Sequence, residues 1–282
     1  MQILIQGALL SALYTIMALG FSMIYGVGGV MNLAHAGYIM VTGYMYYMAT
    51  YTLGLPIIVG FMIAISVGIG LAIITYLGWV RRFLDNFTVV FISTIIMTML
   101  LENVISLVFF RENVNIPPIM EGVTSFMGES FSNQLIFGLI VSWVCIGGLL
   151  FFVRGTHIGR AIRALPMDKK GIIISGIDPA MVNLVVWAIS GALAGVAGVF
   201  YGSFSYLSPT MWVTPLVVCF AIVVIGGLGS IEGTILAAHI IGFAEVITTL
   251  EINQRLRSVP GLVIMIIVLL VRPKGLLGVN NE

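Results

Sequence analysis

Long apolar runs, separated by short polar or glycine-rich stretches, follow one another along the whole chain. A run of about 20 apolar residues is what an α-helix needs to cross the hydrocarbon core of a bilayer. Hydrophobic and polar positions do not alternate with a period of two, which excludes the strands of a membrane β-barrel. The pattern therefore predicts an all-α polytopic membrane protein with about eight transmembrane helices.

We expect a single transmembrane domain over residues 1–282, with eight to ten crossings. Two apolar runs are short for a complete crossing, and glycines interrupt the chain beside others, so broken or re-entrant segments are also expected. The first run lacks a basic flank and a small-residue cleavage pattern, which favours a retained helix over a signal peptide. The expected spans are residues 6–28, 36–53, 56–80, 88–110, 134–153, 181–206, 216–228, 233–250 and 259–271.

Composition indicates that lipid is the solvent of this chain. Of its residues, 60% are hydrophobic and 8% are charged, whereas soluble domains carry about 25% charged residues. Cys145 and Cys219 both lie inside apolar runs, which favours packing roles over a disulfide or a metal site. Nothing in the composition indicates a nucleic-acid partner.

Basic residues predict the orientation, because cytoplasmic loops of membrane proteins carry an excess of Lys and Arg. The stretch 154–180 is rich in both and is expected to be a cytoplasmic loop. The segment 111–133 has one Arg against three Glu residues. It is expected to be an extracytoplasmic loop or lid, which could hold a short helix. The other basic residues assigned to the cytoplasmic side are Arg81, Arg82, Arg272 and Lys274.

The cytoplasmic loop has a pattern of its own. Ala161, Ile162 and Leu165 fall at helical spacing beside two arginines, which predicts a short amphipathic helix. A second short helix is expected to end at Gly176, and Asp178-Pro179 is typical of the start of the next membrane helix. Composition alone favours contact of these helices with anionic lipid, and docking of a cytoplasmic protein stays open as the alternative.

Glycines mark the stretch GGLGSIEG at 226–233. We expect it to break a helix near membrane depth, which is tolerated only where the backbone is buried in protein or lines a cavity. No Gly-Lys-[Ser/Thr] follows, so the stretch is not a phosphate-binding loop, and the chain is not expected to hydrolyse ATP. Glu245, near the end of the next helix, is expected to face the outer water.

A polar stripe runs along the span 88–110, where Ser93, Thr94, Thr98 and Glu102 share one face. A carboxylate inside a span is costly, so Glu102 is expected to face a partner or a wet cavity. The stripe fits a conduction path and an interhelical hydrogen-bond network equally well.

Asn32 and His35 interrupt the apolar pattern near the first span. Gly28 and Gly29 precede them and favour a broken helix, so the two polar side chains either cap helix ends or line a path beside Tyr25. No nucleophile is paired with His35, and no second ligand stands at metal-binding spacing. Neither catalysis nor metal binding is therefore expected.

The chain resembles the permease subunits of branched-chain amino acid ABC importers, of the high-affinity leucine, isoleucine and valine type, and their relatives for urea and short amides. The likeness is carried by ALGFSMIYGVGGVMNLAHAGYIMVTGY (18–44), FISTIIMTMLLEN (91–103), GRAIRALPMDKKGIIISGID (159–178), and VIGGLGSIEGTILAAHIIGFAEV (224–246) with VRPKGLLG (271–278). The chain departs from the usual family pattern at Ala36-Gly37, Ile96 and Glu102, near the implied path.

The resemblance implies a non-enzymatic, multi-pass permease of the cell (inner) membrane that forms half of a translocation path for branched-chain or other apolar amino acids. It implies as partners a second permease chain, two cytoplasmic ATPases that bind ATP and Mg²⁺, and an extracytoplasmic substrate-binding protein. No cofactor is expected in this chain itself.

The resemblance also implies roles for particular residues. On the translocation path it places Tyr25, Asn32, His35, Thr94, Thr98 and Glu102. In coupling to the ATPases it places Gly159, Arg160, Arg163, Ala164, Asp168 and Gly176. In a gate at the broken helix it places Gly226, Gly227, Gly229 and Ser230.

Two alternatives stay open. An importer of urea or short amides is the nearest one. A secondary carrier or channel would use Glu102 for ion coupling and would not need the patterned loop at 154–180.

Overall fold

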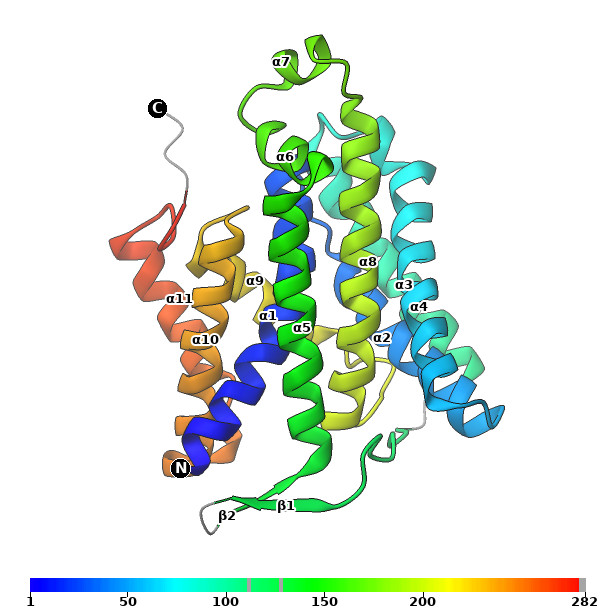
Figure 1. The fold of residues 1–282 in the computed structure, drawn as a ribbon, viewed down its shortest axis with the longest axis vertical. Coiled ribbons are helices and arrows are strands. Elements are labelled where there is room, and N and C mark those ends of the chain that lie inside the picture. Colours follow the sequence, from blue (N-terminus) through cyan, green and yellow to red (C-terminus); the bar gives the residue numbers. More distant parts are fainter. Residues whose placement is uncertain (111–112, 127–128, 279–282) are drawn as a thin grey trace.

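The computed structural model describes residues 1–110, 113–126 and 129–278. It is a bundle of helices with one small β-hairpin (Figure 1). The long elements are α1 (Gln2–Gly28), α2 (Ala34–Tyr47), α3 (Ile57–Gly78), α4 (Phe87–Val108), α5 (Asn133–Gly155), α8 (Pro179–Phe204), α9 (Val213–Gly226), α10 (Ile231–Ile247) and α11 (Val259–Val271). The short ones are η1 (Met48–Thr52), η2 (Val80–Arg82), β1 (Val123–Phe126), β2 (Glu129–Ser132), α6 (His157–Ala164), α7 (Lys169–Ile174), η3 (Thr248–Ile252) and η4 (Gln254–Leu256).

The predicted membrane fold is confirmed. In the described part of the chain, seven helical segments are long and apolar enough to cross a membrane. The other two expected spans are α9, which is only 14 residues long, and α2, which continues into η1. Each of the nine expected spans coincides with one of these helices to within a few residues, because the apolar runs are long and bounded by clear breaks.

The two loops assigned to opposite sides of the membrane lie at opposite ends of the bundle. Figure 1 shows α6 and α7 at one end, and the N-terminus and the hairpin at the other. The segment 111–133 contains a hairpin instead of the short helix considered for it, with Val123 opposite Ser132 and Thr124 opposite Phe131. Arg111 and Glu112 of this segment lie outside the described residues.

Helices α1 and α8 form the centre of the bundle. In each, 72% of the most apolar stretch is buried, against 6% for the helix that includes α11. Glycines let α8 approach its neighbours, since a Cβ on Gly191 would meet the backbone of Gly68 in α3. Thr42 of α2 donates to the carbonyl of Ala194 at 3.0 Å. Small residues thus provide the close helix packing that lipid alone does not drive.

Candidate functional site

The break between α1 and α2 holds two of the predicted path residues. Helix α1 ends where Gly29 adopts a left-handed conformation with φ of 65°, and the Gly29 N–H donates to the Tyr25 carbonyl at 2.9 Å. Asn32 then accepts a hydrogen bond from the backbone N–H of Ala34 through Oδ1, at 3.1 Å. This is the helix-end capping that the glycine-flanked pattern predicted as one alternative.

His35 sits at the start of α2 with 1% of its surface exposed. Its Nε2 lies 2.9 Å from the Met17 carbonyl, and its Nδ1 lies 3.0 Å from the Ser190 hydroxyl. A carbonyl can only accept, so Nε2 carries the proton and Nδ1 accepts from Ser190. Met17 stands eleven residues before the end of α1. That is about 17 Å along the helix, so His35 lies deep inside the bundle and well away from that end of α1.

The polar stripe of α4 satisfies the backbone of the same break. Thr94 accepts from the Leu33 N–H at 3.2 Å, and Thr98 donates to the Leu33 carbonyl at 3.2 Å. Further along, Glu102 accepts a hydrogen bond from Trp212 Nε1 at 2.7 Å. These contacts are those of an interhelical network, and the place of these residues on a translocation path stays a prediction.

A cavity of about 620 Å³ opens at the end of the bundle that carries α6. Tyr25 lines it, together with Gly26 and Arg163. An ion pair between Arg154 of α5 and Glu232 of α10 stands at its wall. The cavity therefore collects the end of α1, the predicted coupling loop and the start of α10 in one place.

The predicted two-helix loop is present as α6 and α7. Thr156 caps α6 by accepting from the Gly159 N–H, and Asp168 caps α7 by accepting from the Gly171 N–H, both at 2.9 Å. Gly176 follows α7 with a φ of 79°, as its predicted position after a helix end requires. Both short helices are thus fixed by local capping.

The other predicted coupling residues lie on α6. Gly159 is buried, and a Cβ there would meet the backbone of α5 at Phe152 and Val153. Arg160 Nη2 lies 2.8 Å from His157 Nδ1, Arg163 faces the 620 Å³ cavity, and Ala164 is half-buried.

Apolar side chains stand uncovered at the tip of this loop. Met167 is 80% exposed and Ile174 is 85% exposed, beside the exposed Lys169 and Lys170. In Figure 1, α7 occupies the extreme end of the molecule, beyond α6. The tip of the loop therefore presents exposed apolar side chains next to basic ones.

The structure contains the predicted helix break at 226–230, and Gly229 and Ser230 line the 620 Å³ cavity at the end of the bundle that carries α6. The position of the break at membrane depth stays a prediction. Gly227 and Gly229 have φ values of 103° and 82°, which only glycine adopts without strain. Ser230 starts α10 by accepting from the Gly233 N–H at 3.0 Å. The C-terminal segment pairs with the end of α9, where the Leu277 N–H donates to the Gly226 carbonyl at 3.0 Å. A gating role of this break stays a prediction.

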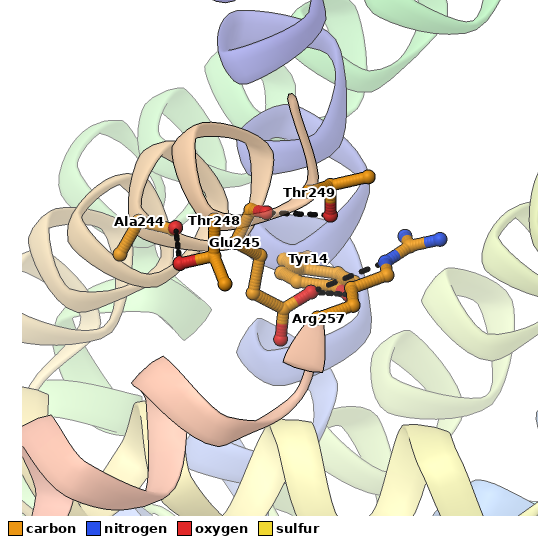
Figure 2. Close-up of polar contacts among 6 residues, drawn as sticks. All are labelled: Tyr14, Ala244, Glu245, Thr248, Thr249 and Arg257. Atoms are coloured by element: carbon orange, nitrogen blue, oxygen red, sulfur yellow. Dashed lines mark hydrogen bonds and ion pairs between the residues drawn. The ribbon is translucent and has the colours of Figure 1, made fainter. Parts of the chain in front are cut away.

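One polar cluster differs from the sequence-based expectation. Glu245 does not face water, because only 1% of its surface is exposed. The Tyr14 hydroxyl donates to its Oε2 at 2.7 Å, and Arg257 Nε lies 3.4 Å from the same oxygen (Figure 2). The guanidinium also stacks over Phe204, 5.0 Å from the ring centre. No local pattern could reveal this cluster, since Tyr14 and Glu245 are 231 residues apart.

Within the described residues, no three His, Cys, Asp or Glu side chains are grouped closely enough to hold a metal ion.

Comparison with known proteins gives the site its context. A family model described as branched-chain amino acid transport system / permease component matches residues 3–269. The high-affinity branched-chain amino acid transport system permease protein LivH of Salmonella typhimurium is 30% identical, covering 99% of this chain and 95% of the relative. The high-affinity branched-chain amino acid transport system permease protein BraD of Pseudomonas aeruginosa is 28% identical, again covering 99% of this chain and 95% of the relative. The ribose import permease protein RbsC of Haemophilus influenzae is 33% identical over 42% of this chain and 40% of its own. No solved structure matches.

Proposed function

Because the chain belongs to the family of branched-chain amino acid transport system permease components, we propose that it forms half of the translocation path of an ABC importer for branched-chain or other apolar amino acids. Besides the family, one observation carries the proposal. The tip of the α6–α7 loop exposes Met167 and Ile174 at the basic end of the bundle, which suits the docking of a cytoplasmic ATPase.

The loop is built to transmit motion. Gly159 brings α6 into backbone contact with the end of α5, and Asp178 caps α8 directly after the loop by accepting from the Ala180 N–H at 2.8 Å. A rigid-body displacement of α6 and α7 would therefore move α5 and α8 with it. Because α8 lies at the centre of the bundle, closure of an ATPase pair would reach the helices that surround the path.

Besides this chain, the proposed assembly has three kinds of component. Two ATPases bind ATP and Mg²⁺ and dock on the α6–α7 loop, and a second permease chain supplies the other half of the path. A substrate-binding protein docks at the end that carries the hairpin. The complex lies in the cell inner membrane. Six residues of this chain lie on its translocation path, namely Tyr25, Asn32, His35, Thr94, Thr98 and Glu102.

Contact with lipid is the competing interpretation of the loop. An interfacial helix buries its apolar face in the headgroup region of the bilayer. Ala161 and Ile162 of α6 are already buried inside the protein, whereas Ile158 of the same helix is 44% exposed. The most exposed apolar side chains of the loop, Met167 and Ile174, lie at its far tip. This distribution supports a protein partner more than a membrane surface.

Charge reversal in the loop tests the proposal. The complex should be isolated through a tag on this chain, placed in proteoliposomes, and assayed for ATP hydrolysis and for uptake of labelled leucine and urea. We expect Arg160→Glu combined with Arg163→Glu to leave the chain folded and to lower leucine uptake per ATP hydrolysed. Arg81→Glu, at the same end but outside the loop, is the matched control and should keep the wild-type ratio.

Two outcomes would count against the proposal. An unchanged ratio in the double variant would indicate that the loop faces only lipid. Isolation of the chain with no ATPase, together with uphill transport by the chain alone, would indicate a secondary carrier.

A further inference from the structure

One ion pair joins α5 to α10 at the end of the bundle that carries α6. Arg154 Nη2, in the last turn of α5, donates to Glu232 Oε1, in the first turn of α10. Both helices pack against α1, and within the described residues no other hydrogen bond or ion pair joins one to the other. Farther along the two helices, the Trp143 and His239 rings lie 5.6 Å apart. The polar link between α5 and α10 is therefore this single pair.

The ion pair stands between two features that the sequence marks. Two residues after Arg154, Thr156 caps α6 and begins the α6–α7 loop. Two residues before Glu232, Ser230 caps α10 and ends the glycine break at 226–230. The pair thus connects the loop on which an ATPase would dock to the break at which a gate is predicted.

The glycine break in turn touches the end of α1. A Cβ on Gly26 would lie 2.9 Å from the Gly229 carbonyl oxygen, so the two backbones are in direct contact. Tyr25, next to Gly26, lines the 620 Å³ cavity together with Gly229, Arg154 and Glu232. A displacement of the start of α10 relative to α5 would therefore change the wall of this cavity and act on the end of α1.

The ion pair is weak enough to open and close. The Arg154 and Glu232 side chains are 61% and 65% exposed. Exposed pairs of this kind are screened by salt, and they shift an equilibrium by about fivefold at most. A contact of that strength does not hold a helix bundle together. It does bias the relative position of two helices that have no other polar link.

We propose that the Arg154–Glu232 ion pair is a latch on the wall of the 620 Å³ cavity. When closed, it holds the end of α5 against the start of α10. When open, it lets the two helices separate there, which widens the cavity. The use of the latch in transport rests on the proposed function, because an ATPase that displaces the α6–α7 loop would open it. The latch itself rests only on the ion pair, its place on the cavity wall and the contact between the glycine break and α1.

Thiol accessibility tests the latch in the full chain alone. Val153 is 2% exposed and lines the cavity beside Arg154, so a cysteine there reports the separation of α5 from α10. The Val153→Cys chain, with both native cysteines replaced by alanine, should be placed in nanodiscs and labelled with uncharged N-ethylmaleimide. We expect Arg154→Glu or Glu232→Arg to raise the labelling rate by about two- to fivefold. The double reversal restores the attraction with its charges exchanged and should restore the slow rate.

Reversal of a neighbouring charge is the matched control. Asp85 lines the same cavity, and its side chain makes no hydrogen bond or ion pair with the other described residues, so Asp85→Arg should label at the wild-type rate. The latch is overturned if the single reversals label no faster than the wild type, or if the double reversal labels as fast as they do.

Salt tests the latch without a reversed charge. At about 1 M potassium chloride the attraction between exposed charges is largely screened, so the chain with Arg154 and Glu232 intact should be labelled faster than at low salt. This result decides the test if a single reversal lowers the melting temperature, and an unchanged rate would overturn the proposal.

Failure of the latch can be told apart from failure of the proposed function. In the assembled complex, each single reversal should lower leucine uptake per ATP hydrolysed, and the double reversal should restore it. If the labelling results hold but the complex imports no leucine, the latch stands and the importer proposal is wrong. If the complex imports leucine with ATP but the reversals change neither labelling nor uptake per ATP, only the latch is wrong.

Discussion

At the residue scale, His35 joins three helices through its two ring nitrogens. It links α2 to the Met17 carbonyl of α1 and to the Ser190 hydroxyl of α8. We expect His35→Ala to lower the free energy of unfolding by about 1–3 kcal/mol, because it removes two buried hydrogen bonds, leaves the buried Ser190 hydroxyl without its acceptor and opens a cavity. Thermal unfolding in nanodiscs measures this loss. Ser190→Ala removes only one of the two bonds and should cost less, and equal melting of both variants and the wild type would contradict this structural role.

Variants of Glu102 distinguish a structural role of this residue from a role in transport. Its Oε2 accepts from Trp212 Nε1, and the amide oxygen of a glutamine could accept the same bond. We therefore expect Glu102→Gln to assemble with wild-type stability and, if Glu102 lies on the path, to change the pH dependence of uptake. Glu102→Leu loses the bond and should melt at a lower temperature. An unstable Gln variant with unchanged uptake kinetics would favour a purely structural role.

The polar residues also mark where sequence reasoning ends. The contacts that Asn32, Thr94 and Thr98 make follow from patterns in the sequence, because a broken helix needs partners for its backbone and a polar stripe supplies them. The environment of Glu245 does not follow, because its partners Tyr14 and Arg257 come from other parts of the chain. Its position near a helix end suggested water, whereas tertiary packing buries it.

At the element scale, glycines decide how closely α3 and α8 pack. A Cβ on Gly68 would collide with the Gly191 carbonyl. A Cβ on Gly70, two residues later on nearly the opposite face of α3, would meet nothing within 4 Å. We expect Gly68→Ala to reduce the yield of folded, monodisperse protein and to lower its melting temperature. Gly70→Ala is the matched control and should lower neither. Similar melting of both variants would contradict the close approach of the two helices.

Element boundaries were the most predictable part of the fold. Apolar runs bounded by glycine, proline or basic residues mark nine spans, and each is a helix in the described chain. The hairpin formed by β1 and β2 was not predicted, since the Gly- and Ser-rich composition of 111–133 indicates a loop without specifying strand pairing. Its register pairs Ser125 with Ser130, and the residues that connect the strands lie outside the described part.

At the scale of the whole molecule, the two ends of the bundle carry different chemistry. One end has the 620 Å³ cavity and the basic, apolar-tipped loop, and the other has a second cavity, of about 380 Å³, lined by Arg257. The basic-residue pattern predicted which loops share an end. It could not predict the cavities, because each is enclosed by segments from several distant helices. This difference between the two ends agrees with the proposed importer, in which substrate arrives at one end and an ATPase docks at the other.

ATP-driven uptake in proteoliposomes tests the central claim most directly. The complex isolated through this chain should be reconstituted with ATP inside the vesicles and labelled leucine and the substrate-binding protein outside. We expect leucine to accumulate against its gradient only when both ATP and the binding protein are present. Leucine uptake that needs neither of them, or ATP hydrolysis that moves urea and no apolar amino acid, would contradict the account.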